Sequence, residues 1–107
     1  MDDGSSIDLY TQFDSVFFEK TRLSILTLLY REGKLSFNTL KEAVKATDGA
    51  LYTHLEKLKE AKYVDRTKEI IDGSVSSQYR LTPSGKKAFR EYVEFLEQVV
   101  KSHTASE

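Results

Sequence analysis

The chain of 107 residues, 39% of them hydrophobic and 31% charged, suits one ordered globular domain with a single modest core. It contains no cysteine, which excludes disulfides, thiolate metal sites and a cysteine nucleophile. The net charge of −1 hides an asymmetry, because residues 1–19 carry five acidic and no basic side chains, whereas residues 33–90 carry twelve basic and seven acidic ones, a net charge of +5. That basic block favours an anionic partner, although a solvated surface would give the same pattern.

The first third of the chain predicts helical structure that ends at Gly33. Residues 1–8 are typical of a disordered lead-in, and apolar residues recur with helical spacing from Leu9 onward. A short extended segment is predicted at residues 35–37. Ser36 is a suitable N-cap for a second helix of about two turns.

A third helix is predicted over residues 48–62, with Thr47 or Asp48 as its N-cap. At 100° per residue, three leucines gather on the side that should face the core: Leu51, Leu55 and Leu58. Small, polar and charged residues lie near the opposite pole or flank it: Gly49, Thr53, Glu56, Glu60, Ala50, Tyr52 and Lys57.

The rest of the chain predicts a β-hairpin and a long last helix. After Lys62 the apolar period changes from 3.6 to 2, and Asp72-Gly73 supplies a turn, so residues 63–81 are expected to form the hairpin. Thr82 and Pro83 then begin a helix that runs to about residue 102, followed by a frayed tail, residues 103–107. This helix carries an apolar stripe with 3-4 spacing: Phe89, Tyr92, Val93, Leu96, Val99 and Val100.

Two short helices in tandem followed at once by a hairpin form a helix-turn-helix with a wing. The segments LYTHLEKLKEAKYV and YRLTPSGKKAF, at this separation, resemble the winged helix-turn-helix transcriptional regulators of bacteria and archaea in the broad MarR-like, ArsR-like and PadR-like group. The resemblance covers residues 13–90. It implies an α+β, mostly helical fold, with the DNA-binding part in residues 9–82 and a dimerisation helix in residues 83–102. The alternative is a generic α+β core with no partner.

The resemblance implies sequence-specific binding of double-stranded DNA by a homodimer, with residues 48–62 in the major groove and residues 63–81 along the backbone or the minor groove. Small and hydrogen-bonding side chains in the first half of the third helix suit close approach to base edges, so Ala50 and Thr53 are expected there, and Tyr52 and Lys57 at phosphates. The remaining candidates are Ser36, Asn38 and Thr39 at the start of the second helix, Gly49 and His54 in the third, and Arg66, Lys68 and Arg80 in the wing.

Some of these residues have a purely structural alternative. Tyr52 can pack against the second helix, His54 can be a half-buried packing residue, and Ser36 can serve only as an N-cap. The wing tip, residues 73–77, carries no charge, which departs from the basic tip of the family. Deep arginine contact with the minor groove is therefore not expected there.

The apolar stripe of the last helix is expected to pack antiparallel against its copy, together with Leu9, Phe13 and Phe17. Such a two-fold dimer would space two recognition helices by one turn of DNA, ~34 Å, and predicts a pseudo-palindromic operator. Packing within one chain is the alternative. With only His54 and His103 as histidines, neither a metal site nor a cofactor is expected, while a small-molecule effector at the dimer interface stays open.

Other functions are weaker. Without a cysteine, a glycine-rich phosphate loop or a clustered histidine–carboxylate set, the sequence predicts no enzyme. A winged helix can also serve as a protein–protein interaction module without specific DNA binding, and the near-neutral charge and bare wing tip favour that alternative. No apolar run approaches the ~20 residues of a membrane span and the start MDDGSS is unlike a signal peptide, so we expect a cytoplasmic protein.

Overall fold

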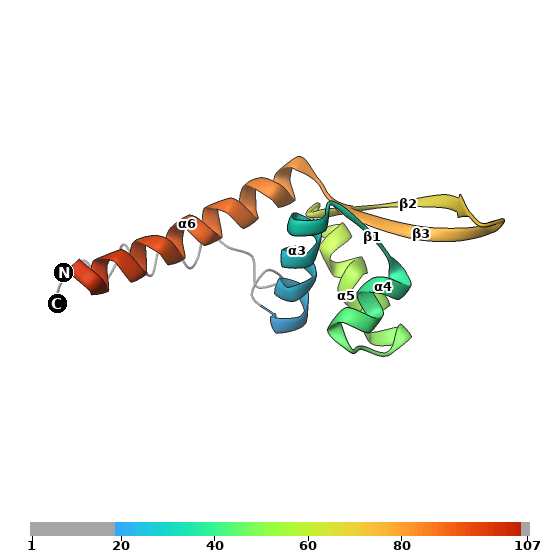
Figure 1. Ribbon diagram of the computed structural model, residues 1–107, viewed down its shortest axis with the longest axis horizontal. Helices are drawn as coiled ribbons and strands as arrows, with labels where there is room; N and C mark the ends of the chain where they lie inside the picture. The colour runs from blue at the N-terminus through green and yellow to red at the C-terminus, as the bar shows by residue number, and fades with distance from the viewer. Residues whose placement is uncertain (1–18, 106–107) are drawn as a thin grey trace.

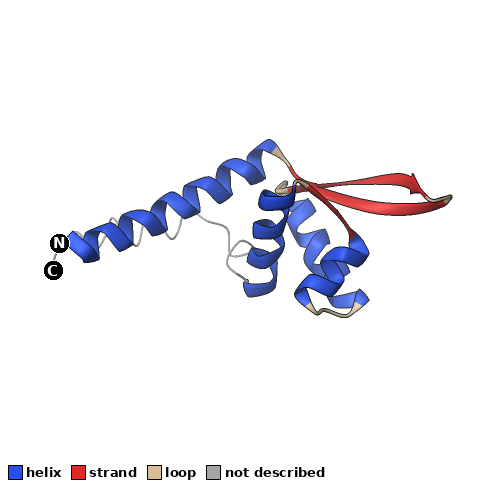
Figure 2. Cartoon of the chain, in the orientation of Figure 1, coloured by secondary structure: helices blue, strands red, loops and turns tan. Residues whose placement is uncertain are grey.

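The structure, a computed structural model, describes residues 19–105. It places a small helical body between a projecting hairpin and a long helix that extends to the opposite side (Figure 1). The strands form one three-stranded antiparallel sheet in the order β1-β3-β2, as the red ribbons of Figure 2 show. The elements in chain order are α3 (Lys20–Glu32), β1 (Lys34–Ser36), α4 (Phe37–Val44), α5 (Asp48–Glu60), β2 (Val64–Ile71), β3 (Ser74–Leu81) and α6 (Pro83–Ala105).

Helix α3 supplies one wall of the core and has a defined cap at each end. At its start the backbone N–H of Arg22 donates to Oε1 of Glu19 over 2.8 Å. At its end Gly33 takes φ 92°, a conformation that suits glycine, and its N–H donates to the carbonyl of Leu29 over 2.9 Å. The inward face of the helix buries Ile25, Leu26 and Leu29.

Helices α4 and α5 form the helix-turn-helix, and a hydroxyl caps each of them. Oγ of Ser36 accepts from the N–H of Thr39 over 3.1 Å, and Oγ1 of Thr47 accepts from the N–H of Ala50 over 3.2 Å. Between the two helices Lys45 takes the left-handed conformation that ends α4. The two helices then contribute four fully buried leucines to the core: Leu40, Leu51, Leu55 and Leu58.

The hairpin of β2 and β3 forms the wing, paired in register from Val64↔Leu81 to Ile71↔Ser74. Asp72 and Gly73 connect the strands with φ of 53° and 80°, and positive φ at both central residues is the signature of a tight hairpin turn. The short strand β1 pairs with the base of β3, so the wing is anchored to the body from both sides of β3.

The junction between the wing and α6 is closely packed. Oγ1 of Thr82 accepts from the N–H of Gly85 over 2.9 Å and donates to the carbonyl of Lys62 over 2.6 Å. The N–H of Thr82 donates to the carbonyl of Tyr63 over 3.0 Å. A Cβ on Gly85 would lie 2.1 Å from that same carbonyl oxygen, so this position requires glycine.

The predicted fold class is confirmed, and the expected order of elements holds within residues 19–105. Three boundaries differ from expectation. The extended segment lies at 34–36 and not at 35–37, because Phe37 already begins α4. Helix α5 ends at Glu60 and not at residue 62, because Lys62 takes a φ of 69°. Helix α6 continues to Ala105, past the expected end at about residue 102. The expected start of the first helix at Leu9 lies outside the described residues. No helix within residues 19–105 combines the length and the apolar character that a membrane crossing requires.

Candidate nucleic-acid interface

The first half of α5 presents its small and polar side chains to solvent. Gly49, Ala50, Thr53 and Lys57 are exposed, and Tyr52 keeps 51% of its surface accessible. The leucines of the same helix are fully buried, so the predicted division of α5 into a core face and an outer face holds. A Cβ at Gly49 would meet no atom within 4 Å, so the backbone stands open on this face.

The start of α4 adds two more exposed candidates, Asn38 and Thr39. Ser36 is half-buried, and both sides of its hydroxyl are occupied: it accepts from the N–H of Thr39 and donates to Oγ1 of Thr39 over 2.9 Å. The N-cap role of Ser36 is therefore observed, while its contact with DNA stays a prediction.

The wing candidates divide between the two faces of the hairpin. Arg66 and Lys68 share one face, because side chains alternate along a strand, whereas Arg80 pairs with Asp65 and lies on the other face. On that second face Nζ of Lys34 lies 2.6 Å from Oε2 of Glu69. This hydrogen bond is the main cause that holds the pKa of Glu69 below its ordinary value.

Glu56 corrects one expectation from the helical pattern. It was expected near the exposed pole of α5, but β2 covers that side of the helix and leaves the Glu56 side chain only 29% exposed. Its Oε2 atom is buried and lies 3.5 Å from Nζ of Lys59 and 4.0 Å from Nη1 of Arg66. Arg66 thus lies close to a carboxylate of α5, and Lys68 is the other cation of this face, closer to the tip.

Tyr79 lies beneath this pair, directly across the ladder from Arg66. Burial raises the pKa of the Tyr79 phenol, and a hydrogen bond with Arg66 acts in the opposite direction. The base of the wing is therefore tied to α5 by packing and by charge, so the two elements present one continuous surface.

His54 lies between α5 and α3. Nη1 of Arg22 is 3.0 Å from Nδ1 of His54, and since a guanidinium can only donate, Nδ1 is the acceptor of this bond. Oε1 of Glu19 is 3.7 Å from the same nitrogen. The partner that sequence reasoning missed is Arg22, 32 residues away along the chain, and contact between His54 and DNA stays a prediction.

The apolar stripe of α6 divides into two parts. Phe89 and Tyr92 pack against the core of their own chain, with the rings of Phe89 and Tyr30 5.0 Å apart. Farther along the helix, Phe95 is buried although the predicted stripe omitted it. The outer residues Val93, Leu96, Val99 and Val100 are exposed. Three predicted partners of the stripe, Leu9, Phe13 and Phe17, lie outside the described residues.

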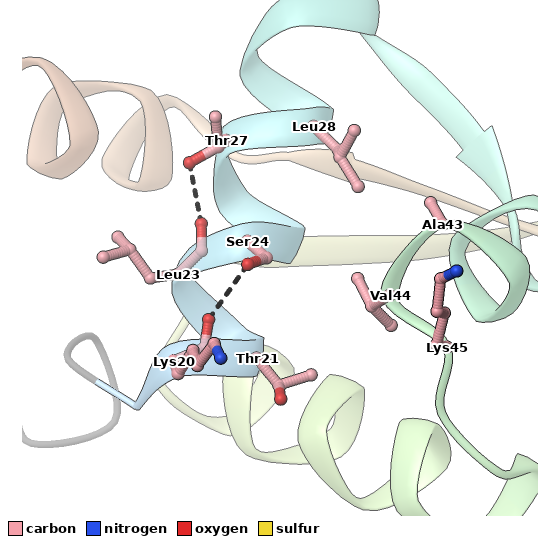
Figure 3. Close-up of a pocket in the computed structure, with 9 residues that line it drawn as sticks. All are labelled: Lys20, Thr21, Leu23, Ser24, Thr27, Leu28, Ala43, Val44 and Lys45. Carbon is pink, nitrogen blue, oxygen red and sulfur yellow. Dashed lines mark hydrogen bonds between the residues drawn. The ribbon is translucent and has the colours of Figure 1, made fainter.

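A broad open groove of about 780 Å³ lies between α3 and the end of α4 (Figure 3). Two of the hydroxyls that line it donate within α3, that of Ser24 to the carbonyl of Lys20 and that of Thr27 to the carbonyl of Leu23. Leu28 and Val44 contribute apolar wall. Across the part of the chain that the structure describes, no group of three or more histidine or acidic side chains is placed to hold a metal ion.

Comparison with known proteins agrees with this geometry. A family model described as a winged helix DNA-binding domain matches residues 21–100. The uncharacterised protein MJ0432 of Methanocaldococcus jannaschii is 38% identical over 87 residues, which are 81% of this chain and 95% of that protein.

Two solved structures share the fold at low sequence identity. A transcriptional regulator homologue from Pyrococcus horikoshii superposes with a TM-score of 0.80 at 19% identity, covering 92% of this chain and 96% of that one. The MepR–DNA complex of Staphylococcus aureus gives a TM-score of 0.74 at 18% identity, covering 96% and 82%. From its sequence match and its fold together, the chain belongs to the family of winged helix DNA-binding domains.

Proposed function

We propose that the protein is a sequence-specific DNA-binding transcriptional regulator that acts as a homodimer. The observation that carries this proposal is the outer face of α5, where small and hydrogen-bonding side chains are exposed beside a wing that carries Arg66 and Lys68 on the adjoining face. An α-helix fits the major groove, and small side chains allow its backbone to approach the base edges.

The residues of this face take different roles in the proposal. Ala50 and Thr53 contact base edges, including a thymine methyl group, because they lie in the first half of α5 and are exposed. Tyr52, Lys57 and Lys68 contact phosphates, which position the protein without reading sequence. Asn38 and Thr39 at the exposed start of α4 add further phosphate contacts.

The exposed part of α6 supports the dimer. Val93, Leu96, Val99 and Val100 form an apolar strip that the described part of the chain leaves open to solvent. Packing of two copies across a two-fold axis would cover it and space the two α5 helices by about 34 Å, so the operator would be pseudo-palindromic. Sedimentation of the free protein at tens of micromolar tests this step, and a monomer would contradict it.

Selection of bound duplexes from a random DNA pool tests the function most directly, because one experiment reports binding, symmetry and half-site spacing. Thr53→Ala should then lower the affinity for the selected duplex by roughly fivefold while leaving random DNA unaffected. Lys68→Ala should weaken both alike and reduce the salt slope by about one. An unchanged ratio of specific to random affinity in the Thr53 variant would remove Thr53 from base recognition.

A protein–protein interaction module is the second candidate. The chain carries a net charge of only −1, and the wing tip is exposed and apolar at Ile70 and Val75. A gel shift at increasing salt separates the two functions, because a DNA-binding protein loses affinity steeply as salt displaces its phosphate contacts.

A further inference from the structure

The wing ends in an exposed apolar pair. Ile70 and Val75 are directly opposite each other in the ladder, one step before the turn, and remain 77% and 68% accessible. They contribute nothing to the core, and exposed apolar side chains at the tip of a hairpin are unfavourable for an isolated protein. A binding role would account for them.

The pair lies on the face of the wing that adjoins α5. Alternation along the strands assigns one face of the hairpin to Val64, Arg66, Lys68 and Ile70, opposite Leu81, Tyr79, Ser77 and Val75. The base of this face packs in the core, and its Arg66 approaches Glu56 of α5. From Arg66 to Ile70 is four residues, about 13 Å of strand.

The two faces of the wing also differ in charge, and the face that holds the apolar pair is the positively charged one. Both acidic residues of β2, Asp65 and Glu69, lie on the opposite face, where Arg80 and Lys34 balance their charge, whereas the face adjoining α5 carries Arg66 and Lys68 and no acidic residue of the hairpin. A polyanion would therefore approach the wing on the face that holds the apolar pair. A cation next to an apolar tip is better suited to binding DNA than to binding an apolar protein surface, because Lys68 can contact a phosphate but has no partner on an apolar surface.

We propose that Ile70 and Val75 form an apolar wedge that enters the minor groove next to the major groove occupied by α5, with Lys68 on the intervening phosphates. This inference rests on the proposed function and specifies how the wing binds. The Cβ atoms of a cross-strand pair lie about 5 Å apart, so the two side chains leave the tip next to each other. Apolar side chains inserted between base steps unstack them and bend the duplex.

Such a wedge would select DNA sequences by how easily their base steps deform, and not by the hydrogen-bonding groups of the bases. Pyrimidine–purine steps unstack and kink readily, so selected duplexes should be enriched in them where the tip reaches, outside the bases contacted by α5. An uncharged tip fits this mode, because the insertion needs no donor to a base.

The test compares the double variant Ile70→Ser/Val75→Ser with Ile71→Ser, whose side chain lies on the opposite face at the same end of the wing. The probe is the tightest duplex recovered by selection, labelled at both ends so that energy transfer reports its bend. The double variant should bind roughly tenfold more weakly and bend the duplex less, with an unchanged salt slope. Ile71→Ser should stay within about twofold of the unmodified protein.

The outcomes separate the wedge from the function on which it rests. Wild-type affinity and bend in the double variant would overturn the wedge while DNA binding stands. Failure of the unmodified protein to enrich any duplex would overturn the proposed function, and the wedge with it. If the double variant instead changes the sedimentation of the free protein and leaves the bend intact, the tip joins protein molecules and the wedge is wrong. Because the substituted side chains are exposed, the thermal midpoint should remain unchanged and serves as the check on folding.

Discussion

Substitution of Gly85 by alanine should disrupt the joint between the body and α6. Gly85 is buried in the first turn of α6, and a Cβ there would lie 2.1 Å from the carbonyl oxygen and 3.0 Å from the carbonyl carbon of Tyr63. Both atoms belong to the backbone, so no side chain can rotate away. Relief requires α6 and the start of the wing to separate by about 1 Å, since Cβ contacts below about 3 Å are not tolerated.

The cost follows from the bonds that cross this joint. The N–H of Thr82 donates to the same Tyr63 carbonyl over 3.0 Å, and Oγ1 of Thr82 donates to the carbonyl of Lys62 over 2.6 Å. Overpacking alone costs about 1–3 kcal/mol, and each hydrogen bond that is lost adds about 1 kcal/mol. We therefore expect Gly85→Ala to reduce the free energy of unfolding by about 3 kcal/mol, which lowers the thermal midpoint by roughly 12 °C or more in a domain of this size.

Gly49→Ala is the matched control, because it makes the same change inside another helix where the new Cβ meets no atom within 4 Å. The two variants lose the same conformational freedom in the unfolded chain, so their difference isolates the contact with Tyr63. Gly49→Ala should leave stability unchanged or raise it by about 0.5 kcal/mol. Thermal unfolding followed by circular dichroism measures both, and a midpoint for Gly85→Ala within about 2 °C of the control would refute the reasoning.

Two further predictions concern charged side chains outside the DNA-facing surface. Burial alone would raise the pKa of Glu19, but the hydrogen bond from the backbone N–H of Arg22 and the positive charge of the Arg22 side chain hold this pKa below the ordinary 4.5. A carboxylate with a lowered pKa stabilises the fold above pH 4.5, and this stabilisation is lost as the pH falls through the pKa of the folded state. Glu19→Ala should therefore reduce the free energy of unfolding by about 1 kcal/mol at pH 7 and by less in acid. A reduction that does not change with pH in urea unfolding would contradict this. Lys34→Met should raise the pKa of Glu69 towards its ordinary value in an NMR titration, because the hydrogen bond from Lys34 is the main cause that lowers it. An unmoved pKa would show that Lys34 is not the cause.

Local chemistry explains which parts of the fold could be predicted from the sequence. Ser36 and Thr82 are predicted as helix caps, and Thr47 is predicted as one with Asp48 as the alternative. In the structure Ser36, Thr47 and Thr82 each accept an N–H from their own helix. The Asp72-Gly73 turn was equally predictable, because positive φ at two consecutive residues demands these residue types. Signals of this kind act over a few residues and survive whatever packs around them.

The missed features depend on contacts between distant elements. Helical periodicity predicts an exposed Glu56 side chain, because it contains no information on where β2 will lie. The same limit hid the bond between Arg22 and His54 and the burial of Phe95 within a helix whose apolar positions otherwise follow the 3-4 pattern. For the residues proposed to contact DNA, the sequence predicts correctly that the small and polar side chains in the first half of α5 are exposed, but the role of each side chain depends on a partner.

The position of β2 in the sheet has a consequence for the protein in isolation. In the sheet of residues 34–81, β2 lies at the edge and pairs with β3 alone, so its other side offers free backbone groups that a strand of another molecule could join. Charged side chains occupy four of its eight positions, Asp65, Arg66, Lys68 and Glu69, and would have to be desolvated or matched by any intruding strand. Only Ile70 and Ile71 are left uncharged at the far end, a stretch too short to nucleate a ladder. The charged side chains of β2 therefore disfavour fibrillar self-association along most of this edge strand.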